Sequence, residues 1–496
     1  MENKIVTRFA PSPTGFLHLG NYRTAIFAYL YAKKNKGDFV LRIEDTDRER
    51  SKKEYEENII ESLKWLGLDY DKFYRQSEHV DKHKFYLEKM IKEGNAYISK
   101  EEAKDGSGVI KELVRFKNPN IDVTFKDEIK GDVTMNTKDL GDFIIAKNIN
   151  EPLFHLAVVV DDFEAGITHI IRGEDHVSNT PRQVLIQRAI GAPIPIYAHM
   201  PLVLGPDKLK LSKRRGALPL TEYKKQGFLP EAILNGVAFV GWNPGTEKEI
   251  FTRKELIDAF DFSRVQKSPA IFSEEKLEWF NKEHMKLLPT DEIKKNILEW
   301  MPENMRDNEI TQKIIPIIFE RIYKWGDVKT VVEEFSYLFG NLKDLSIDLV
   351  WKGLNDDPKN FERTSEYLEK ILDLLEQTED WKYESIKNAI WDYAEKEGKG
   401  NVLWPMRFAL SRIEKSPDPL KLAEILGKST SLERINSAIR FLKSITKITL
   451  NNIDISKNTV NYELNNNTKN TKNTTNDNSS VRSTNTTKGL IYCIKK

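Results

Sequence analysis

The first 66 residues of the chain alternate between two hydrophobic patterns. Ile5-Val6 and Asp38–Ile43 are short apolar runs that predict strands, whereas residues 22–36 and 48–66 carry apolar side chains at helical spacing. The order strand, helix, strand, helix predicts an α/β fold with a doubly wound parallel sheet. Ligands of such sheets bind beyond the carboxyl ends of the strands, so we expect a site in the segments that follow them.

The pattern changes after residue 75 and again after residue 153. One helical segment and three short alternating segments predict a small inserted α+β subdomain between these points: a helix at 82–93 and strands at 109–116, 123–129 and 143–147. The continuously apolar run 156–161 predicts a buried central strand. The second half of the sheet is completed by predicted strands at 168–172, 194–197 and 202–204 and a helix at 181–190.

The remainder of the chain divides into a helical part and a polar tail. Residues 221–450 predict mostly helix, whereas the Asn/Thr-rich tail cannot bury enough apolar surface to order itself and is predicted to be disordered. The expected domains are an α/β domain with the doubly wound sheet at 1–75 and 154–222, the insertion at 76–153, all-α helical domains at 223–315 and 316–450, and the disordered tail at 451–496.

Composition narrows the class of protein. The chain has 496 residues, of which 39% are hydrophobic and 31% charged, and its net charge is only +1, so any nucleic-acid surface must be local. The single cysteine, Cys493, excludes a disulfide framework and a zinc site built from several thiolates. The sequence has no apolar run long enough to cross a membrane and no apolar signal region at its N-terminus, which predicts a cytoplasmic protein.

Two segments of the predicted sheet have side chains suited to phosphate. His18 and Gly20 lie where a helix N-terminus would present free N–H groups and the positive end of its dipole. Residues 207–216 contain five Lys or Arg and follow the last predicted strand, so their amines could fold over a phosphate chain. Each segment alone also fits a plain structural turn or a solvated charged loop.

Together these segments resemble the two sequence marks of the class I aminoacyl-tRNA synthetases. His18-Leu19-Gly20-Asn21 is similar to the first mark and Lys210-Leu211-Ser212-Lys213-Arg214 to the second. Residues 8–15 and 42–47 resemble the bacterial glutamyl group of that family, and so do residues 171–175 and 227–232. Asn21 and Arg214 depart from the general marks in ways common in that group.

The resemblance implies an enzyme that activates L-glutamate with ATP and transfers it to tRNA(Glu). Glutamate would contact Arg8, Ala10, Ser12, Glu44, Phe154 and Arg172, with the arginines on its carboxylates and Glu44 on its ammonium group. ATP would contact His18, Gly20, Asn21, Asp175, Lys210, Leu211, Ser212, Lys213 and Arg214, among which His18, Gly20, Lys210 and Lys213 are the catalytic candidates. Phe154 stands where the family often has a substrate-contacting tyrosine.

The same resemblance sets expectations for cofactors and partners. Mg²⁺ would be carried by ATP, no zinc is expected, and the enzyme would act as a monomer. The helical domain at 223–315 would contact the tRNA stem, and the domain at 316–450 its anticodon. Trp381, Trp391 and Trp404 fit base stacking, but they fit the core of a helical bundle better. Alternatives are a related enzyme that glutamylates a modified tRNA base and an inactive RNA-binding paralogue; whether tRNA(Gln) is also charged stays open.

Overall fold

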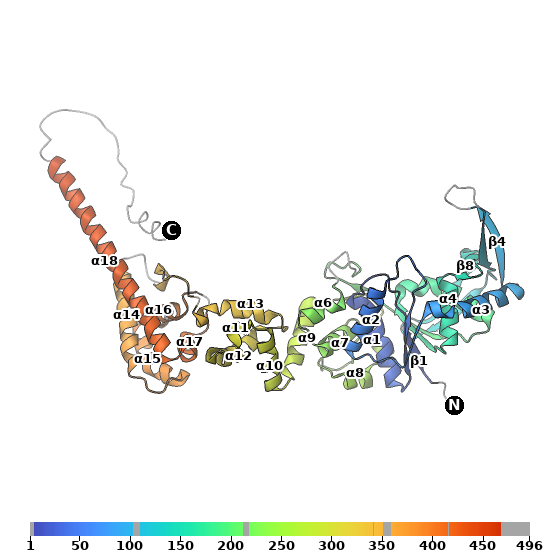
Figure 1. Cartoon of the computed structure of the whole chain (residues 1–496), viewed down its shortest axis with the longest axis horizontal. Coiled ribbons are helices and arrows are strands. Elements are labelled where there is room, and N and C mark those ends of the chain that lie inside the picture. Colours follow the sequence, from blue (N-terminus) through green and yellow to red (C-terminus); the bar gives the residue numbers. More distant parts are fainter. Residues whose placement is uncertain are drawn as a thin grey trace, which may run out of the picture. The chain divides into compact units, whose positions relative to one another are not determined.

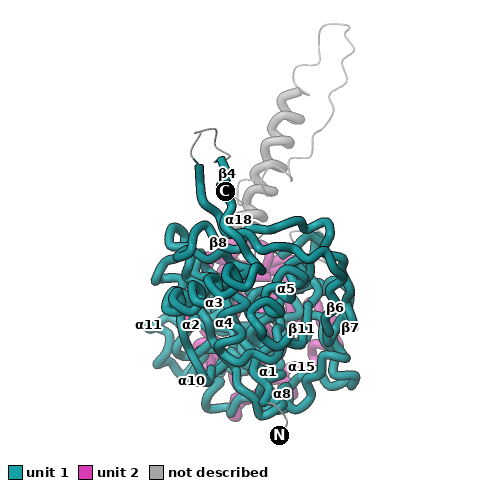
Figure 2. Tube along the Cα trace, turned by 90° about the vertical axis from the view of Figure 1, so that its right-hand side faces the viewer, with its two compact units in different colours: residues 1–334 teal, residues 335–496 magenta. Residues whose placement is uncertain are grey.

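The structure is a computed structural model that describes residues 4–102, 110–211, 218–340, 342–350, 359–414 and 416–467. The chain forms two compact units, residues 1–334 and 335–496, which Figure 2 shows in different colours. Figure 1 labels most of the helices and some of the strands. No described helix combines the length and the apolar character that a bilayer crossing requires.

The first half of the main sheet consists of three parallel strands in the order β1-β2-β3. Two helices cross over between them, as predicted. The strand β3 was not predicted, because its four residues carry charge at both ends and only two of them are apolar. The bounds are β1 (Val6–Phe9), α1 (Leu19–Lys34), β2 (Asp38–Ile43), α2 (Lys53–Leu66) and β3 (Lys72–Arg75).

The second half of the sheet lies beside β1. Thr168 donates its backbone N–H to the carbonyl of Val6 (3.0 Å) just before β10 begins, and β10 pairs in parallel with β11. The order across both halves is therefore β3-β2-β1-β10-β11, and the predicted doubly wound sheet is confirmed. The bounds are α4 (Phe154–Glu164), β10 (His169–Gly173), η3 (Glu174–Asn179), α5 (Thr180–Ile190) and β11 (Ile196–Met200).

Two predictions in this half are wrong. Residues 156–161, expected as a central strand, lie within the helix α4. The run is buried on every side, and a continuous apolar run of this length does not distinguish a buried strand from a buried helix. The segment at 202–204 contains a strand, β12 (Val203–Leu204), but β12 pairs with β13 (Ala270–Ile271) outside the main sheet.

The insertion is an α+β region, as predicted, but it is shared between two sheets. Strands β4, β5, β8 and β9 form an antiparallel sheet of their own, whereas the hairpin of β6 and β7 joins the main sheet where Asp127 pairs with Tyr197 of β11. The bounds are η1 (Gln76–His79), α3 (Val80–Lys92), β4 (Ala96–Glu102), β5 (Ile110–Phe116), β6 (Asp122–Asp127), β7 (Gly131–Asn136), η2 (Lys138–Leu140), β8 (Phe143–Asn148) and β9 (Glu151–Pro152).

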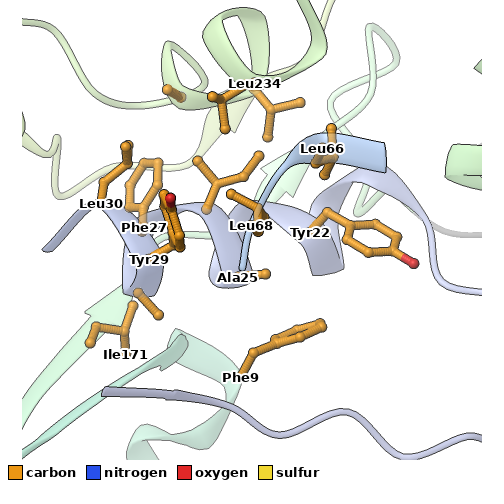
Figure 3. Close-up of a cluster of buried hydrophobic side chains, with 14 of the residues drawn as sticks. Phe9, Tyr22, Ala25, Phe27, Tyr29, Leu30, Leu66, Leu68, Ile171 and Leu234 are labelled. Atoms are coloured by element: carbon orange, nitrogen blue, oxygen red, sulfur yellow. The ribbon is translucent and has the colours of Figure 1, made fainter. Parts of the chain in front are cut away.

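The core around α1 fixes the position of the site. Tyr22, Phe27 and Leu30 are fully buried and pack against side chains from the sheet and from the helices that follow it (Figure 3). Burial of each such side chain contributes about 1.5–3 kcal/mol. The first unit ends with α6 (Leu220–Lys225), α7 (Pro230–Ala238), α8 (Arg253–Ala259), η5 (Phe262–Arg264), α9 (Glu274–Lys286), α10 (Thr290–Trp300), α11 (Glu303–Arg306), α12 (Glu309–Arg321) and α13 (Asp327–Glu334).

The second unit, residues 335–496, is helical in its described part, and the helical fold class predicted for this part of the chain is confirmed. Trp381 and Trp404 donate their Nε1–H groups to the carbonyls of Ala423 and Asp348, which favours the packing interpretation of these two tryptophans. The bounds are η6 (Ser336–Phe339), η7 (Ile347–Leu349), α14 (Lys359–Glu376), α15 (Tyr383–Glu397), α16 (Lys399–Ser411), α17 (Pro419–Leu426) and α18 (Lys428–Asn467).

The helix α18 overlaps the first part of the segment that was predicted to be a disordered tail. It continues to Asn467, past residue 451 where disorder was expected. Once a helix is nucleated, each added residue gains a hydrogen bond, so elongation needs little apolar burial. The rest of that prediction, residues 468–496, lies outside the described residues.

Candidate active site

A cavity of about 480 Å³ opens at the carboxyl ends of β1, β2 and β10. The structure brings together in its lining every predicted site residue that it describes: Arg8, Ala10, Ser12, His18, Gly20, Asn21, Glu44, Phe154, Arg172, Asp175, Lys210 and Leu211. Ser212, Lys213 and Arg214 lie outside the described residues. The two segments that are 192 positions apart in the sequence, at His18 and Lys210, therefore meet at one site.

One end of the cavity is formed by the start of α1. His18 is the N-cap of this 16-residue helix, and its backbone N–H donates to Oδ1 of Asn21 (3.1 Å). A Cβ at position 20 would lie 2.9 Å from Cε1 of His18, so only glycine lets the imidazole fold over the helix start. Lys210 Nζ lies 3.1 Å from Oδ2 of Asp175 at the cavity edge. The helix dipole, the imidazole and the amine make this end suitable for a phosphate chain.

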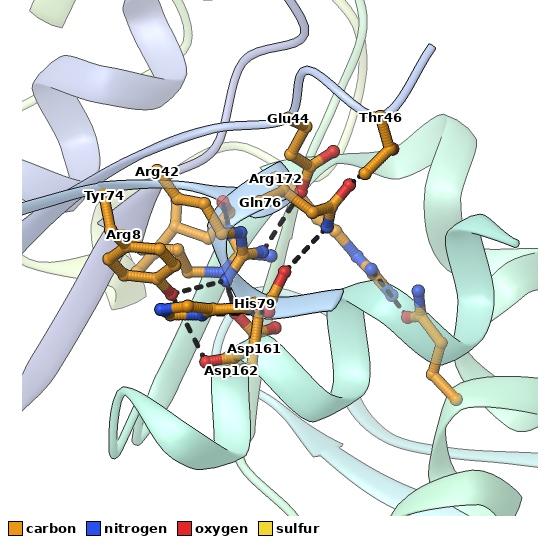
Figure 4. Close-up of polar contacts among 12 residues, drawn as sticks. Arg8, Arg42, Glu44, Thr46, Tyr74, Gln76, His79, Asp161, Asp162 and Arg172 are labelled. Atoms are coloured by element: carbon orange, nitrogen blue, oxygen red, sulfur yellow. Dashed lines mark hydrogen bonds and ion pairs between the residues drawn. The ribbon is translucent and has the colours of Figure 1, made fainter. Parts of the chain in front are cut away.

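The other end is built around a buried charge network (Figure 4). Arg8 Nε and Arg42 Nη1 both contact the same oxygen of Asp162, at 3.2 and 2.6 Å, and Arg42 Nη2 lies 3.1 Å from Glu44. Burial alone would raise the pKa of Asp162, but Arg42 and Arg8 outweigh it and hold that pKa below its usual value. Burial raises the pKa of Glu44 despite the same two arginines.

Arg172 is a cation without a carboxylate partner at this end. Its side chain is 6% exposed, and it donates to His199 Nε2 (3.1 Å), Gln183 Oε1 (2.7 Å) and Thr180 Oγ1 (2.9 Å). Across the described part of the chain, no carboxylate oxygen lies within ion-pair distance of it. Burial lowers the pKa of Arg172 to about 10, so the group stays charged at neutral pH. A buried charge of this kind favours an anionic ligand in the cavity.

An apolar wall faces these arginines. Phe154 is the first residue of α4 and is 41% exposed, and Val158, one turn later, also lines the cavity. The Phe154 ring lies 5.9 Å from the ring of His176. Burial and the nearby Arg172 lower the pKa of His176 to about 4, so its imidazole is neutral at pH 7. His176 therefore adds no positive charge beside Arg172, and the Phe154 side of the cavity is apolar and uncharged.

Sequence reasoning missed the residues that hold the arginines in place. Asp161 accepts hydrogen bonds from His83 Nε2 (2.8 Å) and Gln76 Nε2 (2.7 Å), and Asp162 binds Arg8 and Arg42. A usable signal was present: two aspartates directly follow the apolar run that ends at residue 160, and buried carboxylates require partners. The signal was missed because this run was wrongly assigned to a strand. In the helix that the run actually forms, the two adjacent aspartates contact two different sets of neighbours.

The fold and the site are those of a class I tRNA synthetase. The family described as tRNA synthetases class I (E and Q), catalytic domain, matches residues 4–105 and 98–279, and an anticodon binding domain matches residues 272–439.

Known proteins define the family more narrowly. The chain is 43% identical over 411 residues to the glutamate–tRNA ligase of Aquifex aeolicus, covering 76% of this chain and 86% of that protein. It is 37% identical over 492 residues to the glutamate–tRNA ligase of Clostridium botulinum, covering 90% of this chain and 100% of that protein. A crystal structure of a glutamate tRNA ligase from Elizabethkingia meningosepticum in complex with its amino acid superposes with a TM-score of 0.78 at 33% identity, covering 89% of this chain and 100% of that one. The chain belongs to the glutamate–tRNA ligase family.

Proposed function

We propose that the chain activates L-glutamate with ATP to give glutamyl-adenylate and pyrophosphate, and then transfers glutamate to the 3′ end of tRNA(Glu). The observation that carries the proposal is Arg172, a buried guanidinium with no carboxylate within ion-pair distance among the described residues. It lines a cavity that also contains the start of the 16-residue helix α1. A dicarboxylate and a nucleotide satisfy these two ends together.

Recognition of glutamate follows from the charges at the amino-acid end. Arg8 and Arg172 take its carboxylates, and Glu44 takes its ammonium group. Glutamine carries no side-chain charge, so it would leave a buried guanidinium uncompensated, a mismatch that costs several kcal/mol in comparable buried pairs. Ala10 and Ser12 leave room for the substrate at the start of the loop after β1.

Activation requires alignment more than acid–base chemistry. The α-carboxylate of glutamate is ionised at neutral pH, so it attacks the α-phosphorus of ATP without a general base. His18, Gly20 and Asn21 hold the nucleotide at the start of α1, while Lys210 and Lys213 neutralise charge on the departing pyrophosphate. Leu211, Ser212 and Arg214 belong to the same nucleotide-binding segment.

Mg²⁺ fits this site as a companion of ATP. The two cavity carboxylates that could bind it already face cations, Glu44 the guanidinium of Arg42 and Asp175 the amine of Lys210. The ion would therefore be held by the phosphates and water, where it neutralises charge. We expect no zinc, because Cys493 is the only cysteine of the chain.

The wider assignment is a monomeric cytoplasmic enzyme with tRNA(Glu) as its macromolecular partner. The helical second unit and the anticodon-binding match favour it over an enzyme that modifies a tRNA base, which would need only the catalytic half. The presence of His18, Gly20 and Lys210 in the lining of one cavity favours it over an inactive paralogue.

Pyrophosphate exchange tests the proposal. The expected result is glutamate-dependent exchange between pyrophosphate and ATP, measured with and without tRNA, and little exchange with glutamine or aspartate. Absence of glutamate-dependent exchange under both conditions would refute the assignment. Charging assays on tRNA(Glu) and tRNA(Gln) then determine which tRNA is the substrate.

A further inference from the structure

Arg172 is oriented by a chain of two buried residues that reaches into the insertion. Its Nε–H donates to Nε2 of His199 (3.1 Å), and Nδ1 of His199 lies 2.6 Å from Oδ2 of Asp127. His199 belongs to β11, whereas Asp127 is the last residue of β6. Neither side chain is in the cavity lining, and His199 is fully buried.

The hydrogen bonds fix the tautomer of His199. Because Nε2 accepts from a guanidinium, which can only donate, the ring proton must be on Nδ1, where it is donated to Asp127. Tyr197 stacks on the imidazole at 5.6 Å with an angle of 7° between the planes, and Phe125 meets it edge-on at 6.0 Å. The imidazole can therefore neither rotate nor change tautomer without breaking a contact.

Asp127 is itself held from four directions. Its Oδ1 accepts from the backbone N–H groups of Ile129 and Lys130 (2.9 Å each), and its Oδ2 accepts from the backbone N–H of His199 (3.1 Å) as well as from the ring. Burial alone would raise the pKa of Asp127, but His199 and the backbone donors keep that pKa below its usual value. The carboxylate is thus ionised and fixed in orientation.

These contacts leave Arg172 with a defined free face. Three of its N–H groups are used by His199, Gln183 and Thr180, and a guanidinium has five, so one remains on each terminal nitrogen. The contacts to His199, Gln183 and Thr180 together set the rotation of the planar group about its stem and hence the direction of these two donors, and the Nε contact is the one that His199 and Asp127 supply. We propose that Asp127 and His199 are positioning residues for Arg172, which fix its guanidinium in the orientation that binds a substrate carboxylate.

The inference rests on the proposed role of Arg172 and gives a role in substrate binding to a residue of the insertion. A purely structural role would predict that loss of Asp127 lowers stability and affects glutamate and ATP alike. A positioning role predicts a specific rise in the KM for glutamate, because only the carboxylate-binding cation is misplaced.

Asp127→Asn is the decisive variant. Whichever way the amide turns, its NH₂ group would face N–H donors, either those of Ile129 and Lys130 or those of His199. If the NH₂ group faces the Nδ1–H of His199, the clash is relieved when the ring proton moves from Nδ1 to Nε2. The Nε2–H then faces the Nε–H of Arg172, so that two donors oppose each other. The expected result is a KM for glutamate raised on the order of tenfold or more, with the KM for ATP within about twofold of wild type.

Replacements of His199 give the rescue. His199→Gln places a carbonyl oxygen within reach of Arg172 without needing Asp127, so its KM for glutamate should stay near the wild-type value, whereas that of His199→Leu should rise. Asp127→Asn added to His199→Gln should have no further effect on this KM. Asp142→Asn is the matched control, because this carboxylate of the insertion accepts from the backbone N–H of Asn118 and the hydroxyl of Tyr97 rather than from a residue that contacts Arg172.

The measurement is tRNA-supported pyrophosphate exchange with full-length protein, together with the melting temperature of each variant. A normal KM for glutamate in both Asp127→Asn and His199→Leu would overturn the positioning role while leaving the proposed function intact. Absence of glutamate-dependent exchange in the wild-type protein would instead refute the proposed function. If Asp127→Asn does not fold, the comparison of His199→Leu with His199→Gln decides the question.

Discussion

Replacing Arg172 by lysine keeps a positive charge at the amino-acid end of the cavity but removes the planar fork of donors. Arginine makes three hydrogen bonds to neutral groups and keeps two N–H groups for a ligand, whereas lysine has three donors in total and cannot satisfy both sets. The smallest expected loss is one charge-assisted hydrogen bond to substrate, about 1.5–3 kcal/mol, which raises the KM for glutamate about 10- to 150-fold.

Arg172→Ala removes the charge as well and extends this range. Truncation of one member of a buried charge pair costs about 2–5 kcal/mol, or about 30-fold to several thousandfold in KM. Arg172→Ala also removes the donors that Arg172 supplies to Gln183 and His199, although the Thr180 hydroxyl, 3.1 Å from His199 Nε2, can donate to that nitrogen instead. Each buried group left unsatisfied lowers the free energy of unfolding by about 1–3 kcal/mol.

The assay varies glutamate at saturating ATP and ATP at saturating glutamate in pyrophosphate exchange with tRNA present. Arg182→Lys is the control, since Arg182 lies on α5, the helix that supplies Thr180 and Gln183 to Arg172, while its own guanidinium contacts the Ser178 carbonyl and the Phe143 ring. A KM for glutamate within about twofold of wild type in Arg172→Lys, or an equal rise in the KM for ATP, would refute the assignment of Arg172 to the glutamate carboxylate.

Three further predictions concern other parts of the site. Gly20→Ala displaces the His18 imidazole and should therefore lower kcat about 10- to 100-fold. The melting temperature should not fall, because alanine is the better helix former. A normal kcat would refute the role of His18 in nucleotide binding. Phe154→Tyr adds a hydroxyl at the cavity wall that can form a hydrogen bond to glutamate, so the KM for glutamate should fall about 2- to 10-fold in steady-state assays. A higher KM would contradict this prediction and indicate that the hydroxyl clashes with the substrate. Burial lowers the pKa values of His155 and His176 to about 4 in the folded protein. On acidification the unfolded chain therefore takes up protons before the folded protein does. The contribution of these two histidines to stability is complete above about pH 6.5 and should be lost as the pH falls towards 4. Urea midpoints measured from pH 7.5 to 4.5 check the sign, and a midpoint that rises on acidification would contradict it.

The periodicity of hydrophobic residues was sufficient to predict helices and strands that have one buried and one more exposed face. Residues 22–36 and 181–190 were predicted as helices and Asp38–Ile43 as a strand, and all three were confirmed within a few residues. Periodicity failed for α4, whose apolar run is buried all round, and for β3, which is too short to show a pattern. The contribution of β6 to the main sheet was also not predictable, because strand pairing between distant segments has no local signal.

The lining of the site was predictable, but its support was not. Arg8 and Arg172 were identified from motif resemblance, and the structure places both at the cavity. Their partners lie far from them in sequence: Asp162 is 154 positions from Arg8, and His199 is 27 positions from Arg172. These partners become neighbours only in the folded protein. Their spacing in a single sequence therefore does not identify them.

The helix α4 links the shape of the pocket to its charge. Its first residue, Phe154, forms part of the cavity wall, and Asp162, two turns later, accepts from Arg8 and Arg42 through a single oxygen. A change of substrate therefore cannot be engineered by moving this wall alone, because any shift of the helix also moves the shared anion and both cations with it. Adaptation to a larger or an uncharged amino acid would have to begin in the protein interior, and residues that never meet the substrate would set the range of amino acids that this enzyme could evolve to accept.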